Sequence, residues 1–110
     1  MPQYDKDKTF DALAIRDTAL KTSTASDHQQ FSPKTIAVCN KLNQQVTFQL
    51  QGSFDSSFPE VFNIGATFDV AANTNSWQNA SVYFPYLRLT AQCSTAPTTG
   101  TLTVFFLKVE

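Results

Sequence analysis

The last ten residues, "TLTVFFLKVE" (residues 101–110), carry the pattern that decides the fold class. Side chains alternate between the two faces of a β-strand, so Leu102, Val104 and Phe106 share one face, as a half-buried strand requires. The opposite face is also apolar and consists of Phe105, Leu107 and Val109. A strand that is apolar on both faces lies inside its own domain or is covered by another chain. We therefore expect these three residues to form a subunit interface, unless the N-terminal segment folds back and covers them.

Short strand patterns at intervals of about ten residues precede this segment. The clearest is "VTFQLQ" (residues 46–51), in which Val46, Phe48 and Leu50 alternate with polar residues. Turn-forming residues separate the other strand-like segments, which are "KTIAVCN", "VFNIGATFDVAA", "WQNASVYF" and "PYLRLTAQC". No segment has a convincing helical pattern. The sequence therefore predicts an all-β fold, an antiparallel β-sandwich of immunoglobulin-like or jelly-roll-like type.

Residues 1–30 differ from the rest because they contain few large apolar groups and end in a polar run, "STASDHQQ". Leu13 and Ile15 alternate like a strand, whereas Phe10 and Leu13 would share one face of a helix. We interpret residues 1–30 as an extended, partly flexible N-terminal arm and residues 31–110 as the sandwich domain. The arm is expected to lie along the domain or on a neighbouring subunit, with Phe10, Leu13 and Ile15 as its contacts.

The charge balance and the residue types argue against several functions. Charged residues make up 15% of the chain and the net charge is −1, so there is no electrostatic reason to expect nucleic acid as a partner. No stretch of about 18 apolar residues occurs, so no segment is expected to span a membrane. The same charge balance gives no reason to expect an anionic membrane as a partner. The single histidine, His28, lies in a polar run without the neighbours that a catalytic base needs. We expect a protein that is not an enzyme and has no catalytic residue, cofactor or metal.

The two cysteines are expected to be reduced. Cys93 continues the apolar face of its strand, whereas Cys39 falls on the face opposite Ile36 and Val38. A disulfide between these faces would need a bulge or an unusual sheet arrangement.

Three larger aromatic residues suggest a ligand platform. Trp77, Tyr83 and Tyr86 combine flat ring faces with polar groups, which suits the binding of sugar rings. The loop "GSFDSSFPE" (residues 52–60) would contribute to the same site. The alternative is that Tyr83 and Tyr86 flank Pro85 at a corner of the sandwich and that Trp77 seals an edge of the core.

Several segments resemble small β-sandwich virion proteins of tailed bacteriophages, of the capsid decoration or head-associated type. They are "KTIAVCNKLNQQVTFQLQGS", "FDVAANT" and "YFPYLRLTAQCSTAPTTGTLTVFFLK", together with "IRDTA" near the start. The resemblance extends over about residues 13–109 and consists of strands and turns rather than a catalytic motif. It implies assembly in the host cytoplasm, reduced cysteines and binding to a capsid shell, often as trimers. The major capsid protein would then be the partner, and the capsid surface of the virion would be the location.

The function expected from the sequence is that of a phage capsid decoration (cement) protein that associates with itself. Two alternatives remain open: a carbohydrate- or host-surface-binding module of a phage tail or fibre, and a tail or baseplate connector with the same fold.

Overall fold

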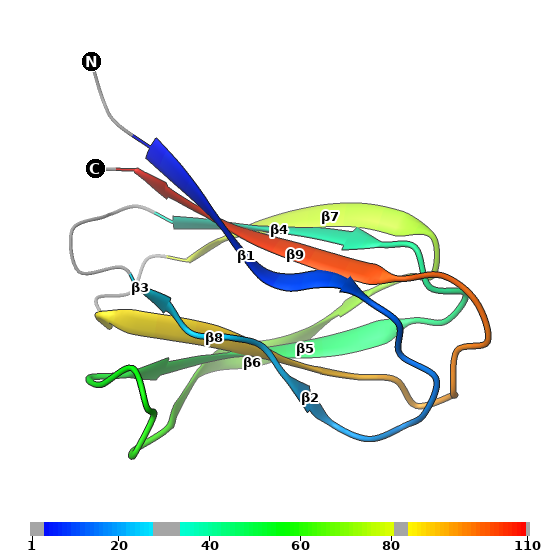
Figure 1. Cartoon of the computed structure of the whole chain (residues 1–110), viewed down its shortest axis with the longest axis horizontal. Helices are drawn as coiled ribbons and strands as arrows, with labels where there is room; N and C mark the ends of the chain where they lie inside the picture. Colours follow the sequence, from blue (N-terminus) through cyan, green and yellow to red (C-terminus); the bar gives the residue numbers. More distant parts are fainter. Residues whose placement is uncertain (1–3, 28–33, 81–83, 110) are drawn as a thin grey trace.

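The structure, a computed structural model, describes residues 4–27, 34–80 and 84–109. Within these ranges the regular elements are strands (Figure 1), and no helix is long and apolar enough to cross a membrane. The strands are β1 (Tyr4–Leu13), β2 (Lys21–Thr22), β3 (Ser26–Asp27), β4 (Lys34–Asn40), β5 (Val46–Ser53), β6 (Phe62–Val70), β7 (Thr74–Ala80), β8 (Tyr86–Gln92) and β9 (Leu102–Val109).

The strands form two antiparallel sheets packed face to face (Figure 1). Sheet A has the order β1-β9-β4-β7, and sheet B has the order β2-β8-β5-β6, with β3 also paired to β8. Apart from β2–β3 and β5–β6, each connection carries the chain from one sheet to the other. If β2 and β3 are taken as one interrupted strand, this is the strand order of a double-sheet jelly roll. The prediction of an antiparallel β-sandwich is confirmed, in its jelly-roll form.

The core lies between the sheets and follows the period-two pattern of the sequence. In β9, Leu102, Val104 and Phe106 are buried, and in β5 the alternating apolar residues are buried as expected. Each large apolar side chain removed from water stabilises the fold by about 1.5–3 kcal/mol. The further core residues are Phe10, Ile15, Ile36, Val38, Leu42, Val46, Phe48, Leu50, Val70, Leu87, Leu89, Ala91 and Cys93.

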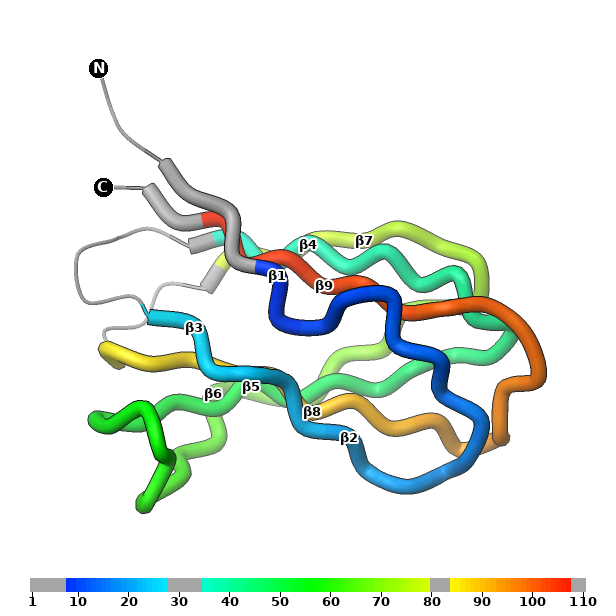
Figure 2. Tube along the Cα trace, viewed as in Figure 1, coloured from blue at the N-terminus to red at the C-terminus, as the bar shows by residue number. Residues whose placement is uncertain are grey.

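The described part of the N-terminal segment lies along the domain, which is one of the two positions expected for the arm, but its strands belong to the two sheets and are not divided from the sandwich at residue 30. Within residues 4–27, β1 pairs with β9 from Tyr4 to Leu13 with two register shifts, and β2 and β3 pair with β8. Figure 2 shows the coloured part of β1 beside β9 and β2 and β3 beside β8. Phe10 and Ile15 are only 5% and 1% exposed, and Leu13 packs against the core. These residues are therefore part of the sandwich interior, and β1 lies beside β9 rather than over its face.

Irregular pairing explains why the pattern of β1 was weak in the sequence. The register between β1 and β9 shifts after Lys8 and again after Phe10, and Ala12 adopts a positive φ of 49°. A β-bulge inserts an extra residue and changes which side chains face the core, so the period of two is lost. The apolar spacing of Phe10, Leu13 and Ile15 therefore matches neither a regular strand nor a helix.

The two ends of the sandwich differ in chemistry. At the end that holds the β4–β5 turn, the buried Asn40 side chain donates from Nδ2 to the carbonyls of Gln44, Val70 and Ala71 at 3.0–3.2 Å. Its Oδ1 accepts from the Leu42 amide at 3.1 Å. The side-chain amide of Asn40 therefore joins the β4–β5 connection to the β6–β7 connection. The opposite end, where the β5–β6 loop lies, carries the aromatic side chains described below.

Candidate functional site

The second apolar face of β9 lies on the outside of sheet A, in the middle of the sheet. Because β9 is flanked by β1 and β4, Phe105 has Lys8 and Ala37 beside it, and Ala37 pairs in turn with Trp77. Phe105 and Leu107 are half-buried, and Trp77 is 67% exposed. Val109 pairs with Tyr4 at the end of β9, and its side chain lies outside the described residues. We call this surface the outer face of sheet A.

Neighbours in the same sheet supply the partial cover of this face. The Lys8 Nζ lies 5.4 Å from the centroid of the Phe105 ring, within the range of a cation–π interaction. Lys8 also forms an ion pair with Asp11, at 3.4 Å, on an exposed surface. In the described part of the chain no other element is stacked on the outer face of sheet A. Its role as a subunit interface stays a prediction.

The three aromatic residues expected as a ligand platform are not brought together. Trp77 pairs with Ala37, which alternates with buried residues, so Trp77 is on the outer face of sheet A. Tyr86 alternates with the buried Leu87 in β8, so it is on the outer face of sheet B. The two outer faces point in opposite directions. Tyr83 lies outside the described residues. A platform that includes both Trp77 and Tyr86 is therefore wrong, because the residues belong to different sheets.

A cluster of phenylalanines at the β5–β6 end was not singled out from the sequence. Phe54, Phe62 and Phe84 contact one another, with ring centroids 5.3–5.8 Å apart. Phe54 is 67% exposed and Phe62 is 40% exposed, whereas Phe84 packs against the core. Gly52 makes room for this packing, because a Cβ there would lie 2.5 Å from the Phe84 Cγ. We call these three phenylalanines the aromatic end cluster.

The loop that carries Phe54 is fixed to sheet B. Phe58 is buried, and the Arg88 guanidinium lies over its ring, 4.2 Å from the centroid. Arg88 Nε also donates to the Gln51 Oε1 at 2.9 Å. Asp55 accepts hydrogen bonds from the Ser57 amide and hydroxyl, both at 3.0 Å, and these bonds hold the pKa of Asp55 below its ordinary value. The loop is therefore an ordered support that presents an exposed phenylalanine.

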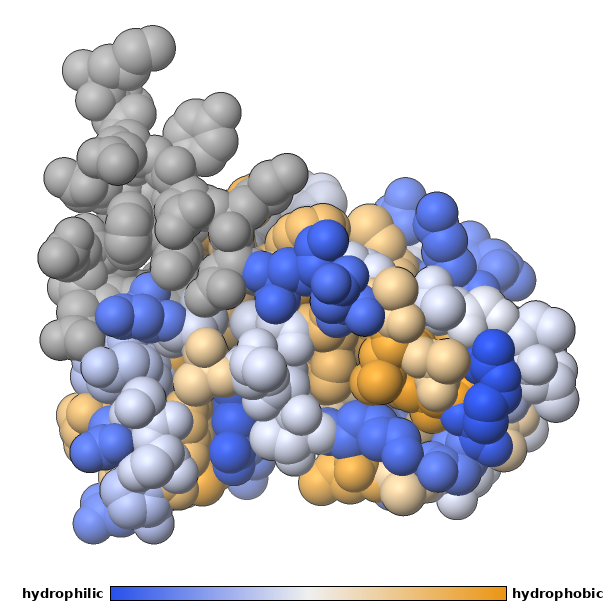
Figure 3. Space-filling model, in the orientation of Figure 1, coloured by the Kyte–Doolittle hydropathy of each residue, from blue (hydrophilic) through white to orange (hydrophobic). Residues whose placement is uncertain are grey.

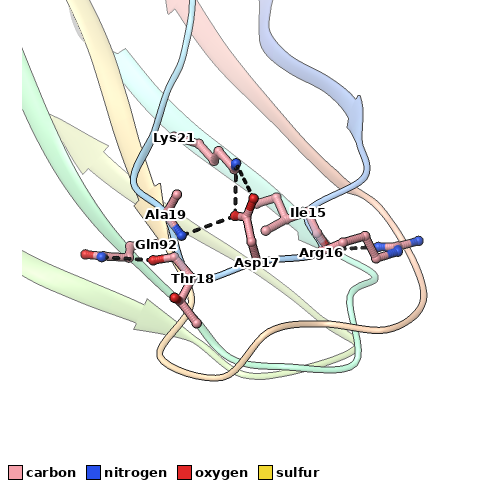
Figure 4. A network of polar contacts seen from close by, with 7 residues as sticks. All are labelled: Ile15, Arg16, Asp17, Thr18, Ala19, Lys21 and Gln92. Carbon is pink, nitrogen blue, oxygen red and sulfur yellow. Dashed lines mark hydrogen bonds and ion pairs between the residues drawn. The ribbon is translucent and has the colours of Figure 1, made fainter.

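A polar network fastens the β1–β2 connection to β8 (Figure 4). The Asp17 carboxylate accepts hydrogen bonds from the Lys21 ammonium (3.2 Å) and the Ala19 amide (3.1 Å), and these bonds lower the pKa of Asp17. The Gln92 side chain donates to the Thr18 carbonyl at 3.1 Å. Each group has a structural partner at a turn, so the network supports the fold. An open hollow beside it is lined by Thr18, Thr47, Gln92, Cys93 and Ser94.

The cysteines occupy the faces that alternation predicted. Cys93 is buried in the core, and burial together with the nearby charge of Asp17 raises the pKa of its thiol. Cys39 is half-buried on the outer face of sheet A, and both thiols are free. Among the described residues, no three His, Cys, Asp or Glu side chains gather into a metal-binding group. His28 lies outside those residues.

The flank formed by β1, β2 and β3 has a mixed surface. Seen in Figure 3, hydrophilic and hydrophobic residues alternate over this side of the molecule. Here the Thr24 amide and hydroxyl both donate to the Thr9 carbonyl, at 3.4 and 3.3 Å, and so link the two sheets. In the described part of the chain the exposed large apolar residues are Trp77 on the outer face of sheet A, Phe54 and Phe62 in the aromatic end cluster, and Leu20 and Val61.

No family model and no curated protein matches this sequence. Solved structures share its fold. The PBSX exported protein XepA is 13% identical with a TM-score of 0.69, and the match covers 96% of this chain and 36% of XepA. The SPBc2 prophage-derived protein YomS is 10% identical (TM-score 0.56), with 100% and 96% of the two chains covered. The coat protein of tobacco streak virus is 8% identical (TM-score 0.56), with 99% and 85% covered.

These likenesses concern the fold. The chain spans about a third of the length of XepA but nearly the whole of YomS. At these identities no binding residue is transferred from any of the three proteins to this chain.

Proposed function

We propose that this protein is a non-enzymatic viral structural protein, and more specifically a capsid decoration protein of a tailed bacteriophage. It would bind the major capsid protein at the surface of the virion, after synthesis in the host cytoplasm, and would associate with itself, with a trimer as the favoured state. Support comes from a fold shared with the PBSX exported protein XepA, the prophage-derived protein YomS and a viral coat protein.

The observation that carries the proposal is the outer face of sheet A. Phe105 and Leu107 lie in the middle of a sheet, and Trp77 adds a large exposed ring to the same face. A half-solvated antiparallel sheet normally carries polar residues on its outer face. Apolar residues there favour contact with another protein, because each gains stabilisation when it leaves water.

Repetition would make such contacts effective on a shell. One contact of this kind is modest in area, but subunits linked to each other and to a symmetric capsid bind at many points together. Linked binding events raise the overall affinity well above that of a single contact. A role of this kind needs no group-transfer chemistry.

The test of self-association is the native mass of Leu107→Asp. A charge at the centre of the outer face is expected to lower the native mass measured by size exclusion with light scattering, or to make the protein insoluble. The matched control is Thr22→Asp, which places the same charge on an exposed strand residue of sheet B and should leave the mass unchanged. A soluble Leu107→Asp oligomer of unchanged mass would remove Leu107 from the interface.

The test of location is mass spectrometry of purified phage particles, separated into heads and tails. Recovery of this protein with heads supports decoration of the capsid. Recovery with tails alone would replace this proposal by a tail or baseplate connector.

A host-surface-binding module is a second candidate function, favoured by the exposure of Phe54 on an anchored loop. Binding to host cells or glycans that disappears in Phe54→Ser would support it. If Trp77→Ala binds host cells or glycans as strongly as the wild type, Trp77 on the outer face of sheet A takes no part in that binding.

A further inference from the structure

An unpaired strand edge is a template for another strand, and proteins usually protect it. The β1 edge carries alternating charges, "DKDK" at residues 5–8, and two register shifts. The β6 edge is bent by an irregular pairing at Gly65, where φ is +69°. β2 and β3 are each two residues long, and the amide of Thr24, which lies between them, donates a hydrogen bond to the Thr9 carbonyl of β1. Three of the four sheet edges therefore carry a recognised form of protection.

The β7 edge carries none of these features. Its sequence, "TNSWQNA", has no charged residue, proline or glycine. It pairs with β4 over seven residues without a register shift, from Thr74 opposite Asn40 to Ala80 opposite Lys34. In the described part of the chain its other side has no strand partner. β7 is therefore a regular, uncharged edge that is ready to accept a strand.

We infer that β7 pairs with β7 of a second copy of this chain, antiparallel, about a two-fold axis at Trp77. Identical strands related by a two-fold axis pair antiparallel, and the contact is self-complementary. With Trp77 opposite its copy, Asn75 stands opposite Asn79 and Ser76 opposite Gln78. Every pair is neutral, and the amides and hydroxyls are able to hydrogen-bond across the strands. Sheet A thus becomes one continuous eight-stranded sheet in the dimer.

Trp77 gains the most from this arrangement. It is the central residue of β7 and is 67% exposed in the single chain. Directly opposed residues in an antiparallel pair have Cβ atoms about 4.5–5.5 Å apart, so the two indoles would pack together on the outer face of sheet A. The exposure of Trp77, which a ligand platform does not explain, is then the exposure of half an interface.

The neighbouring strand supports a second copy as the occupant. β6 is the edge of sheet B on the same flank (Figure 1), and its apolar residues are incompletely covered. Phe62 is 40% exposed, and Ile64 and Phe68 are half-buried. A two-fold axis through the β7 pair brings the equivalent flank of the copy alongside, which shields these residues. An unrelated strand would cover only the backbone edge.

The inference concerns the β7 edge of sheet A, whereas the contact in the proposed function is centred on Phe105 and Leu107 of β9. Trp77 belongs to both surfaces. It predicts an even number of copies, so a β7 dimer would replace the trimer that the proposed function favours. Leu107→Asp leaves the β7 edge intact, so its effect on native mass separates the two contacts.

The experiment uses two double variants of the full chain that place charges at the same exposed positions. In Asn75→Lys/Asn79→Lys, like charges oppose each other at both ends of the pair, and the dimer dissociation constant is expected to rise roughly tenfold or more. In Asn75→Asp/Asn79→Lys, opposite charges face each other and the dimer is expected to persist. Both variants lose the same hydrogen bond between Thr35 and Asn79, so they are matched in the single chain.

Native mass across the micromolar range, with Trp77 fluorescence as a second readout, gives the result. A wild-type dimer that is weakened only in the Lys/Lys variant supports the β7 pair. A monomeric wild type, equal masses for the two variants, or a wild-type trimer would each overturn it. Far-UV circular dichroism and urea midpoints are measured to check that both variants fold.

Discussion

A methyl group added at Gly52 is expected to displace Phe84 and open the aromatic end cluster. The Cβ of Gly52→Ala would lie 2.5 and 2.8 Å from the Cγ and Cδ2 of the Phe84 ring, and 2.9 Å from the Ile64 Cδ1. Overpacking of this kind costs about 1–3 kcal/mol. The lower entropy of the unfolded alanine chain offsets about 0.4–1 kcal/mol of it. We expect a net loss of about 1–2 kcal/mol in the free energy of unfolding.

A double-mutant cycle with Phe84→Ala tests whether the ring is the cause. Loss of this partly buried ring is expected to cost about 2 kcal/mol, less than the 3–5 kcal/mol of a fully buried phenylalanine. In the double variant the methyl at position 52 enters space that the ring has left. The double variant should therefore lose no more free energy of unfolding than Phe84→Ala alone. The coupling energy between the two substitutions should be about 1–2 kcal/mol in favour of folding.

The assay is urea unfolding followed by far-UV circular dichroism. Gly65→Ala is the control, because nothing lies within 4 Å of its Cβ and only its positive φ of +69° opposes alanine. That backbone strain costs about 1–2 kcal/mol, and it should add to the loss in Phe84→Ala without coupling. If the losses in free energy of unfolding of Gly52→Ala and Phe84→Ala simply add, the close contact between Gly52 and the Phe84 ring does not hold the aromatic end cluster, and the reasoning fails.

Three further predictions concern the two faces of β9, the two cysteines and the carboxylate of Asp17. Phe106→Ala should cost about 3–5 kcal/mol in urea unfolding, and Phe105→Ala clearly less, because its ring is only half-buried; equal losses would contradict the assignment of faces. Iodoacetamide should modify native Cys39 well before Cys93, as peptide mass mapping would show, because the Cys93 thiol is buried and its pKa is raised; simultaneous modification would argue against this core. The pKa of Asp17 is below its ordinary value of 3.8, so its contribution to stability is present above that value and is lost as the pH falls below it. Asp17→Asn should therefore flatten the acid side of a thermal-unfolding pH profile, and an unchanged profile would refute the role of the Lys21 contact.

Local pattern determined the fold class and much of the core. Strict alternation in residues 46–51 and 102–106 predicted the buried residues of β5 and β9, because in regular strands a period of two follows from backbone geometry alone. The same rule placed Cys93 in the core and Cys39 outside it. The two register shifts of β1 broke that period, so the place of Phe10 and Ile15 inside the sandwich was not visible in the sequence.

Relations between strands were decided by the tertiary structure. Sequence placed Trp77 and Tyr86 close together in the chain, but the chain crosses between the sheets after β7, so the two rings face opposite sides. It did not show that Phe54, Phe62 and Phe84 meet, because their contact depends on the space that Gly52 leaves in a neighbouring strand. Nor did it show that β7 is an edge. Side-chain alternation is a local property of the backbone, whereas the neighbours of a strand depend on how distant segments pair.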